Sequence, residues 1–179
     1  MSTKKYNAIR LKLSKLFVRE KTKTNRKVTP ISLQKAKKVG LFFAVENNID
    51  IDNALYVYNQ LKNIGVSAVA LGYVVNYKDL AKYREQSFFD FFTDKDLDFL
   101  YRTKTDLPTT FVDTEFDVLI DINAVDYYPT RLMLSQSKAH FRIGLFAENH
   151  PFDLMLCVEK EKGCKYYYEQ IEFYLQKFN

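Results

Sequence analysis

Residues 39–44 read VGLFFA, a run without a polar side chain that is typical of a strand buried on both faces of a parallel sheet. A polar loop follows. Residues 52–63 then carry Leu55, Tyr58 and Leu61 at helical spacing, and Gly65 marks the end of that helix. Residues 66–74, VSAVALGYV, form the next apolar run. Because parallel strands need crossover connections, which are usually helical, this order predicts a parallel α/β unit.

The alternation of apolar runs and helical patterns continues to the end of the chain. Further strands are expected over residues 88–92, 116–122 (FDVLIDI), 141–146 and 153–158, and further helices over residues 94–101, 130–138 and 165–177. The helix over 94–101 is expected because Thr93 and Asp96 have the spacing of a capping box. We therefore predict a three-layer, Rossmann-like α/β domain with a mostly parallel sheet over residues 39–179.

Charge divides the chain at residue 38. Residues 1–38 contain thirteen Lys and Arg against one acid, Glu20, whereas the remaining residues contain fourteen basic and 21 acidic side chains. Residues 6–19 have the pattern of a basic amphipathic helix, with Ile9, Leu13 and Leu16 on its apolar face. Residues 20–38 are interpreted as an extended linker with one short turn near residues 32–37. The sequence thus predicts a basic arm, residues 1–38, followed by the α/β domain, residues 39–179.

The basic arm is the strongest functional signal in the sequence. Each Lys or Arg placed on a phosphate releases condensed counterions, so a basic segment binds nucleic acid without reading its sequence. The candidate RNA-binding residues are Lys4, Lys5, Arg10, Lys12, Lys15, Arg19, Lys21, Lys23, Arg26, Lys27, Lys35, Lys37 and Lys38. We expect structured RNA or a ribonucleoprotein such as the ribosome as the partner. An anionic membrane surface, an acidic protein partner and a solvated tail remain as alternatives.

A candidate ligand site follows the predicted strand over residues 116–122. Asp121, Asn123 and Asp126 cluster there, where the carboxyl end of a strand in an open α/β sheet places binding residues. Asx residues also close turns and cap helices, which is the alternative interpretation. The loop after residue 44 has no glycine and carries Glu46 and Asp50, which argues against a nucleotide cofactor.

Nothing in the sequence identifies a reaction or a metal. His140 and His150 have no Ser or Cys at motif spacing, and Cys157 and Cys164 have no CxxC partner. We expect no cofactor, no metal and two free thiols. The longest weakly polar run, residues 64–75, is shorter than the ~20 residues of a transmembrane helix, so neither a membrane span nor a signal peptide is expected.

Two resemblances support the fold prediction. The stretch FDVLIDINAVDYYPTRLMLSQSKAHFRIGLF, residues 116–146, resembles the N-terminal half of lipopolysaccharide heptosyltransferases. Residues 38–179 resemble a family of short bacterial proteins of unassigned function that carry the same VGLFF, ALGYV, FDFFTDKDL, FDVLIDI and FRIG blocks. The first resemblance implies a half-Rossmann shape, and such enzymes bind their nucleotide-sugar donor largely on a second domain.

The function expected from the sequence is that of a non-enzymatic, cytoplasmic binding protein. Its arm would anchor it to structured RNA or the ribosome and leave the acidic domain available to a protein partner. The alternative is a degenerate or partner-dependent glycosyltransferase-like domain that the same arm holds at the inner membrane surface.

Overall fold

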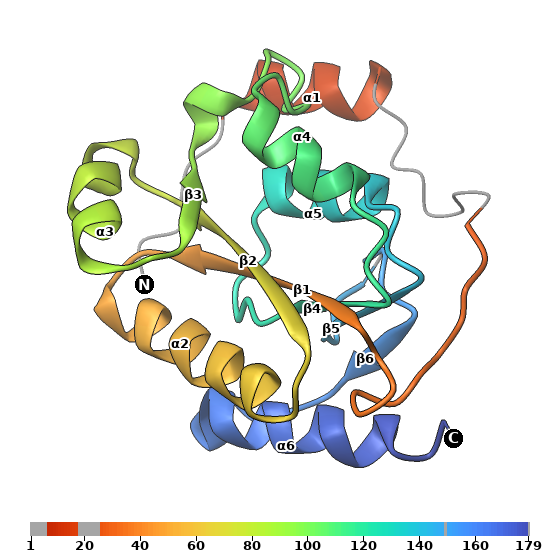
Figure 1. Cartoon of the computed structure of the whole chain (residues 1–179). Coiled ribbons are helices and arrows are strands. Elements are labelled where there is room, and N and C mark those ends of the chain that lie inside the picture. The colour runs from red at the N-terminus through yellow and green to blue at the C-terminus, as the bar shows by residue number, and fades with distance from the viewer. Residues whose placement is uncertain (1–6, 18–25, 149, 179) are drawn as a thin grey trace.

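A single parallel sheet organises the molecule (Figure 1). The structure, a computed structural model, describes residues 7–17, 26–148 and 150–178. The strands are β1 (Lys38–Val45), β2 (Ser67–Val74), β3 (Asp90–Phe92), β4 (Val118–Asp121), β5 (Phe141–Leu145) and β6 (Leu154–Leu156). Their order is β3-β2-β1-β4-β5-β6, and every neighbouring pair is parallel. Each of these strands overlaps a run predicted from the sequence.

The run at residues 39–44 forms the central strand, as its lack of polar side chains requires. Val39 of β1 pairs with Ala68 of β2 on one side and with Val118 of β4 on the other. Gly40 lies where a Cβ atom would approach the Phe116 ring to 2.8 Å. The absence of a side chain at this position therefore lets an aromatic ring pack directly on the strand.

Helices cover both faces of the sheet and complete the predicted three layers (Figure 1). On one face lie α2 (Asn48–Asn63) and α6 (Gly163–Leu175), whose apolar side chains join those of β1 and β2 in one core. On the other face α4 (Asp106–Asp113) and α5 (Tyr128–Gln136) enclose a second core. The short helix α3 (Leu80–Gln86) lies beside β3, and α1 (Ala8–Phe17) lies over the α5 side. The α/β, Rossmann-like architecture is therefore confirmed.

The helix predicted over residues 94–101 is wrong. Thr93 and Asp96 do form a capping box, but they cap only a 3₁₀ turn over Asp94–Asp96. Asp98 then accepts hydrogen bonds from the backbone N–H groups of Leu100 and Arg102, at 2.8 and 3.0 Å, and closes a tight loop. These local side-chain bonds compete with the helix and end it. The sequence analysis also missed α3 and α4, which are short and lack a side-chain hydrogen bond at the N-cap.

Candidate functional site

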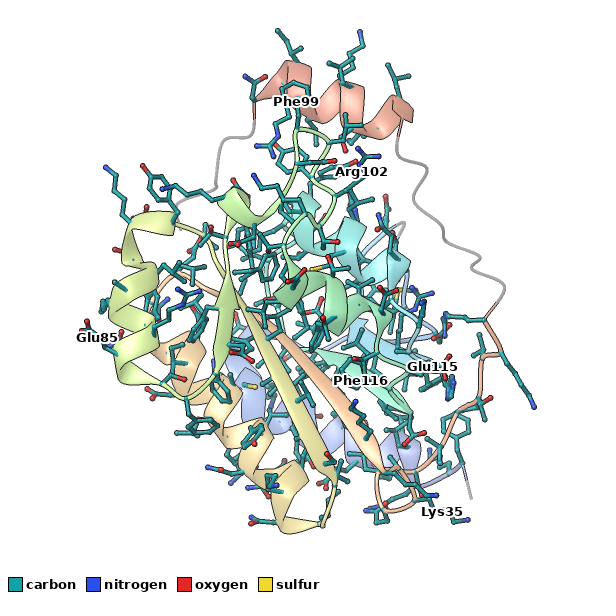
Figure 2. All side chains as sticks on the ribbon, turned by 45° about the horizontal axis from the view of Figure 1, so that its top comes forward. Lys35, Glu85, Phe99, Arg102, Glu115 and Phe116 are labelled. Carbon is teal, nitrogen blue, oxygen red and sulfur yellow. The ribbon has the colours of Figure 1, made fainter. Side chains whose placement is uncertain are left out.

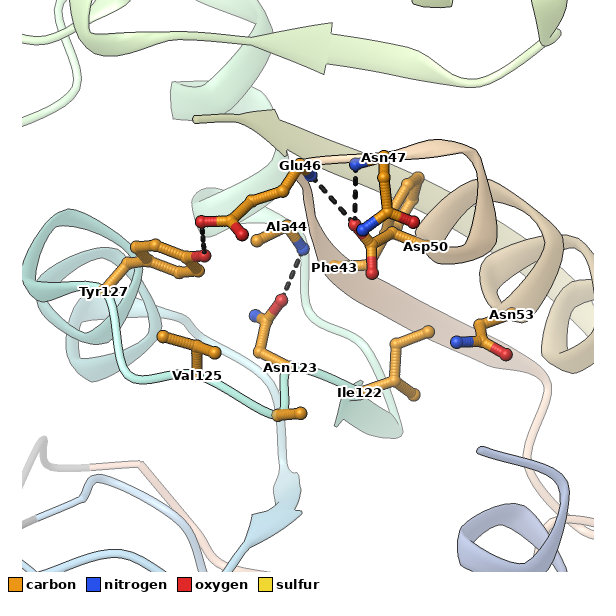
Figure 3. Close-up of a pocket in the computed structure, with 11 residues that line it drawn as sticks. Phe43, Ala44, Glu46, Asn47, Asp50, Asn53, Ile122, Asn123, Val125 and Tyr127 are labelled. Carbon is orange, nitrogen blue, oxygen red and sulfur yellow. Dashed lines mark hydrogen bonds between the residues drawn. The ribbon is translucent and has the colours of Figure 1, made fainter. Parts of the chain in front are cut away.

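The order of the strands places a crevice between β1 and β4. The chain proceeds from β1 toward β3 on one side and from β4 toward β6 on the other, so this is where connections diverge at the carboxyl edge of the sheet. A pocket of about 200 Å³ lies there. Its walls come from the loops that follow β1 and β4 and from the first turns of α2, as Figure 3 shows.

Asn123 ties the two loops together. Its side-chain oxygen accepts a hydrogen bond from the backbone N–H of Ala44 in β1 (Figure 3). Its own backbone N–H donates to Asp121 Oδ1 at 2.9 Å, which is the Asx turn that the sequence allowed. The Asn123 side-chain nitrogen is buried and has no hydrogen-bond partner among the described residues. An unpartnered donor of this kind is costly unless a ligand or water meets it.

Asp121 and Asp126 line a second, smaller pocket of about 50 Å³ on the other side of Asn123. Asp126 forms an ion pair with Arg131, in which 2.8 Å separate Asp126 Oδ2 from Arg131 Nη1. The Nε2 atom of His150 lies 3.3 Å from Asp126 Oδ1. The His150 side chain is 7% exposed and stacks on the Phe152 ring at 4.9 Å. The structure thus brings the three predicted residues together and adds His150, which no sequence spacing connects to them.

The two carboxyl groups of the smaller pocket differ in their pKa. Burial raises the pKa of Asp121 to about 7, against the opposing effects of its Asn123 hydrogen bonds and of His150. Burial also acts to raise the pKa of Asp126, but His150 and the Arg131 guanidinium together hold it below its usual value. The site therefore combines one carboxyl that titrates near neutral pH with one that stays ionised.

The loop after β1 is closed to phosphate by its own side chains. Asn47 accepts from the N–H of Ile49 at 2.9 Å, and Asp50 Oδ2 accepts from the N–H groups of Glu46 and Asn47 at 2.8 and 3.0 Å. Glu46 in turn accepts from the Tyr127 hydroxyl at 2.6 Å (Figure 3). Three N–H groups at or just before the start of α2 are thus already paired with carboxylate and amide oxygens, which leaves fewer of them for a phosphate.

Two cations of the predicted basic arm are engaged within the protein. Arg10 donates to the backbone oxygens of Phe99 and Asp98, at 3.0 and 2.8 Å, and its guanidinium lies 3.7 Å from the centre of the Tyr101 ring. On the same face of α1, the Ser14 hydroxyl lies 2.7 Å from Leu100 O and 2.8 Å from Tyr128 Oη. The helix therefore docks on its own domain through a polar face.

Arg26 is buried at the other end of the arm. Its guanidinium donates to the backbone oxygens of Ala139 and His140, both at 2.9 Å, and forms an ion pair with Asp153. Close by, Leu33 is fully buried in the core shared with α2 and α6. The predicted turn is present, with Lys35 and Ala36 donating to Ser32 O. The division into an arm and a domain stays a prediction, but residues 26–37 pack against the sheet.

Six predicted cations are exposed lysines that form no ion pair within the described part of the chain: Lys12, Lys15, Lys27, Lys35, Lys37 and Lys38. The other five predicted cations lie outside the described residues: Lys4, Lys5, Arg19, Lys21 and Lys23. The same is true of the linker over residues 18–25.

Residues 7–17, 26–148 and 150–178 contain no group of three or more His, Cys, Asp and Glu side chains arranged to hold a metal ion. None of their helices has both the length and the apolar character that crossing a membrane requires.

Comparison with known proteins identifies a family for this chain. No curated protein and no solved structure matches the chain, so the likeness to heptosyltransferases stays a prediction. Residues 5–178 match the family described as "Family of unknown function (DUF6913)". Because this match spans nearly the entire sequence, including most of the basic segment, the chain belongs to that family of unknown function.

Proposed function

We propose that this protein is a non-enzymatic, cytoplasmic binding protein whose basic N-terminal segment attaches it to structured RNA or to a ribonucleoprotein such as the ribosome. The observation that carries the proposal is the set of six exposed lysines that form no ion pair with another described residue, on a segment with a single acid. Unpaired surface cations are those available to phosphates. The acidic remainder of the chain is repelled by the same phosphates and faces away from them.

The exposed lysines form two groups. Lys12 and Lys15 lie on α1, whereas Lys27, Lys35, Lys37 and Lys38 precede or begin β1. Lys35 lies at the opposite end of the molecule from α1 (Figure 2). A folded RNA that presents phosphates over a broad surface can meet both groups, whereas a short single strand meets one. The arrangement therefore favours structured RNA.

The salt dependence of binding tests the number of phosphate contacts. If the six lysines engage phosphates, the logarithm of the affinity falls with the logarithm of the salt concentration at a slope of about −4 to −5. The measurement is co-sedimentation with purified ribosomes, and fluorescence anisotropy with ribosomal RNA fragments, over a salt series. A slope near zero, or association that survives RNase treatment unchanged, contradicts the proposal.

Charge-reversal variants test where the RNA binds. Replacing Lys35, Lys37 and Lys38 together by Glu removes one group, and replacing Lys12 and Lys15 by Glu removes the other. Each variant should weaken binding to all RNA sequences alike, because phosphate contacts position without specifying. The matched control replaces the exposed Lys82, Lys162 and Lys165 by Glu, which makes the same change of net charge outside the basic segment. Equal loss in the control and in the first variant would show a net-charge effect only.

The second candidate function is that of a glycosyltransferase-like domain held at the inner membrane surface by the same segment. One observation favours such attachment: Ile9 and Leu16 of α1 are 70% and 66% exposed, beside Lys12 and Lys15. A helix with an apolar and basic face of this kind binds parallel to the surface of an anionic membrane.

Liposomes separate the two candidates. Replacing Ile9 and Leu16 by Asp should abolish co-sedimentation with anionic liposomes if the membrane is the partner, because the remaining cations alone bind weakly. The same variant should keep most of its RNA affinity if RNA is the partner. Binding of the parent protein to liposomes, together with no binding to ribosomes at low salt, would replace the first proposal by the second.

A further inference from the structure

The two pockets at the carboxyl ends of β1 and β4 adjoin each other, and together they are called the depression here. Asn123, Ala124 and Val125 belong to the walls of both, so the loop after β4 is a shared partition. The larger pocket measures about 200 Å³ and the smaller about 50 Å³. Pockets that hold drug-sized molecules have volumes of about 300 to 1,000 Å³, so this depression fits a small ligand rather than a dinucleotide.

Unpartnered donors occur on the shared wall and in the smaller pocket. Asn123 Nδ2 is buried without a partner, and neither ring nitrogen of His150 forms a hydrogen bond with a described residue. The Nε2 atom is 3.3 Å from Asp126 but lacks the geometry of a hydrogen bond. Since a neutral imidazole carries one N–H donor and one acceptor nitrogen, His150 can both give and take a hydrogen bond.

Acceptors line the same two pockets. Glu46 and Asp50 line the larger pocket, and Asp121 and Asp126 line the smaller one. No Lys or Arg belongs to the described walls of either pocket. Of these four acidic side chains only Asp126 has a cation beside it, Arg131, so a phosphate or carboxylate ligand would be repelled.

A cationic ligand fits only half of the site. An ammonium group offers donors alone and would leave the Asn123 amide nitrogen without an acceptor. A hydroxyl group carries one donor and two acceptor lone pairs, so a molecule with several hydroxyls can satisfy both the carboxylates and the unpartnered nitrogens. The Tyr127 side chain lines the larger pocket as well and offers an apolar surface to the carbon skeleton of such a ligand.

We infer that this depression is a binding site for a small, uncharged polyhydroxyl molecule of the size of a monosaccharide or cyclitol, with Asn123 and His150 as its donors. The site lies at the carboxyl edge of the sheet and includes none of the six exposed lysines, so it is distinct from the proposed RNA contacts. The sheet domain would bind this ligand while the basic segment binds RNA. The proposal therefore stands or falls independently of the RNA proposal.

The test is an NMR titration of the full chain with D-glucose, D-ribose and myo-inositol at millimolar concentration, and with spermidine and ADP as charged comparisons. We expect saturable shifts of the Asn123 side-chain amide and of the His150 ring with at least one of the three neutral probes. If none of the three neutral probes produces saturable shifts, water alone occupies the depression and the proposal is overturned. A response to spermidine or ADP only also overturns it.

Variants locate the bound probe without disturbing the core. Ala124 is exposed and belongs to both walls, so Ala124→Phe fills the depression from outside and should abolish the shifts. Ala81→Phe places the same ring on the exposed surface of α3 and should leave binding unchanged.

A second variant tests the role of His150. Replacement by Phe keeps an aromatic ring on Phe152 but removes both nitrogens, and should weaken binding about tenfold. Binding equal to that of the parent would exclude the smaller pocket from the site and refute the joined depression proposed here.

Discussion

At the scale of single residues, main-chain oxygens bind three of the arginines. Arg10 donates to two backbone oxygens of the loop at residues 98–99, and Arg26 to two more at residues 139–140. Arg142 is fully buried in β5 and donates to Leu134 O at 2.7 Å, and burial lowers its pKa to about 10. A guanidinium holds several donors in one plane, so it can join separate loops where a lysine cannot. Counting charges along the sequence therefore overstates the cations available to RNA.

Asp121 should make the stability of the protein depend on pH in an unusual direction. Its pKa is raised to about 7 in the folded state, so the folded protein holds this proton more tightly than the unfolded chain does. The stabilising contribution is complete below the unfolded pKa near 4 and is lost as the pH rises through 7, by a free energy on the order of 4 kcal/mol. Asp121→Asn stays neutral and keeps an oxygen for the Asn123 N–H, so it should not show this loss.

The measurement is the free energy of unfolding by urea for both proteins between pH 4 and pH 8. As the pH rises across this window, the free energy of unfolding of the variant should increase relative to that of the parent. Asp117→Asn, at a second carboxylate that accepts backbone N–H bonds, is the control for general titration. A constant difference between parent and variant at all pH values would contradict the raised pKa.

At the scale of elements, two side-chain contacts position the segments that surround the site. The Phe152 ring lies over β5 where Gly144 has no side chain, and it holds His150 by stacking. On the opposite side of the α5 N-terminus, α1 contacts Tyr128 through Ser14, next to the pocket residue Tyr127. Small changes at Gly144 or Ser14 should therefore reach the site through neighbouring elements.

Gly144→Ala should destabilise the protein by about 1 to 3 kcal/mol, because an added Cβ would lie only 2.1 Å from a carbon of the Phe152 ring. The check is a double-mutant cycle of urea unfolding with Phe152→Leu. If the clash is the cause, the substitution costs much less in the Phe152→Leu background. Equal costs in both backgrounds would place the effect elsewhere in the strand.

Ser14→Ala should loosen α1 without unfolding the sheet. The change removes the hydroxyl that bridges Leu100 O and Tyr128 Oη, so a partly buried and a buried hydrogen bond are lost. Hydrogen exchange of the amides in α1 should accelerate several-fold, while exchange in β1 and β4 stays unchanged. Lys12→Ala, on the exposed face of the same helix, is the matched control. Unchanged exchange in the Ser14 variant would mean that other contacts hold the helix.

At the scale of the whole molecule, the N-terminal segment belongs to two different regions. Residues 8–17 dock on the α5 side, whereas residues 26–37 run along the other end of the sheet, where Thr29 donates to His140 O at 3.2 Å (Figure 1). Lys37 and Lys38 donate their backbone N–H groups to Asp117, and Leu33 fills the core. The second part therefore resembles an extension of the domain more than a free linker.

Two truncations measure where the domain begins. Deleting residues 1–25 should leave a cooperatively unfolding protein, because Arg26, Leu33 and their contacts remain. Deleting residues 1–37 should cost at least about 3 kcal/mol more, since it removes a fully buried leucine together with the ion pair to Asp153. The measurement is the stability of both truncated proteins in thermal and urea unfolding, and the single substitution Leu33→Ala in the full chain is the control. Equal stability of the two truncations would confirm the domain boundary at residue 38 that the sequence predicts.

Sequence patterns alone were enough to predict the strands and the class of the fold. Apolar runs such as residues 39–44 report burial directly, and the strand–helix alternation allows few arrangements other than a parallel sheet. Asp121, Asn123 and Asp126 could be placed at a strand end for the same reason. The loop at residues 94–101 was mispredicted because a valid capping box was followed by Asp98, whose bonds to later N–H groups ended the helix.

Contacts between residues far apart in the sequence became visible only in the folded chain. Arg26 and Asp153 are 127 positions apart, and Ser14 and Tyr128 are 114 apart. His150 reaches Asp126 only because β5 and its following loop lie beside β4. Such pairs depend on the order of the strands and on the packing of whole elements, whereas a local pattern records only the period and the burial of its own segment. For that reason the sequence could count the cations of the basic segment, and only the fold could show that Arg10 and Arg26 serve the protein's own structure.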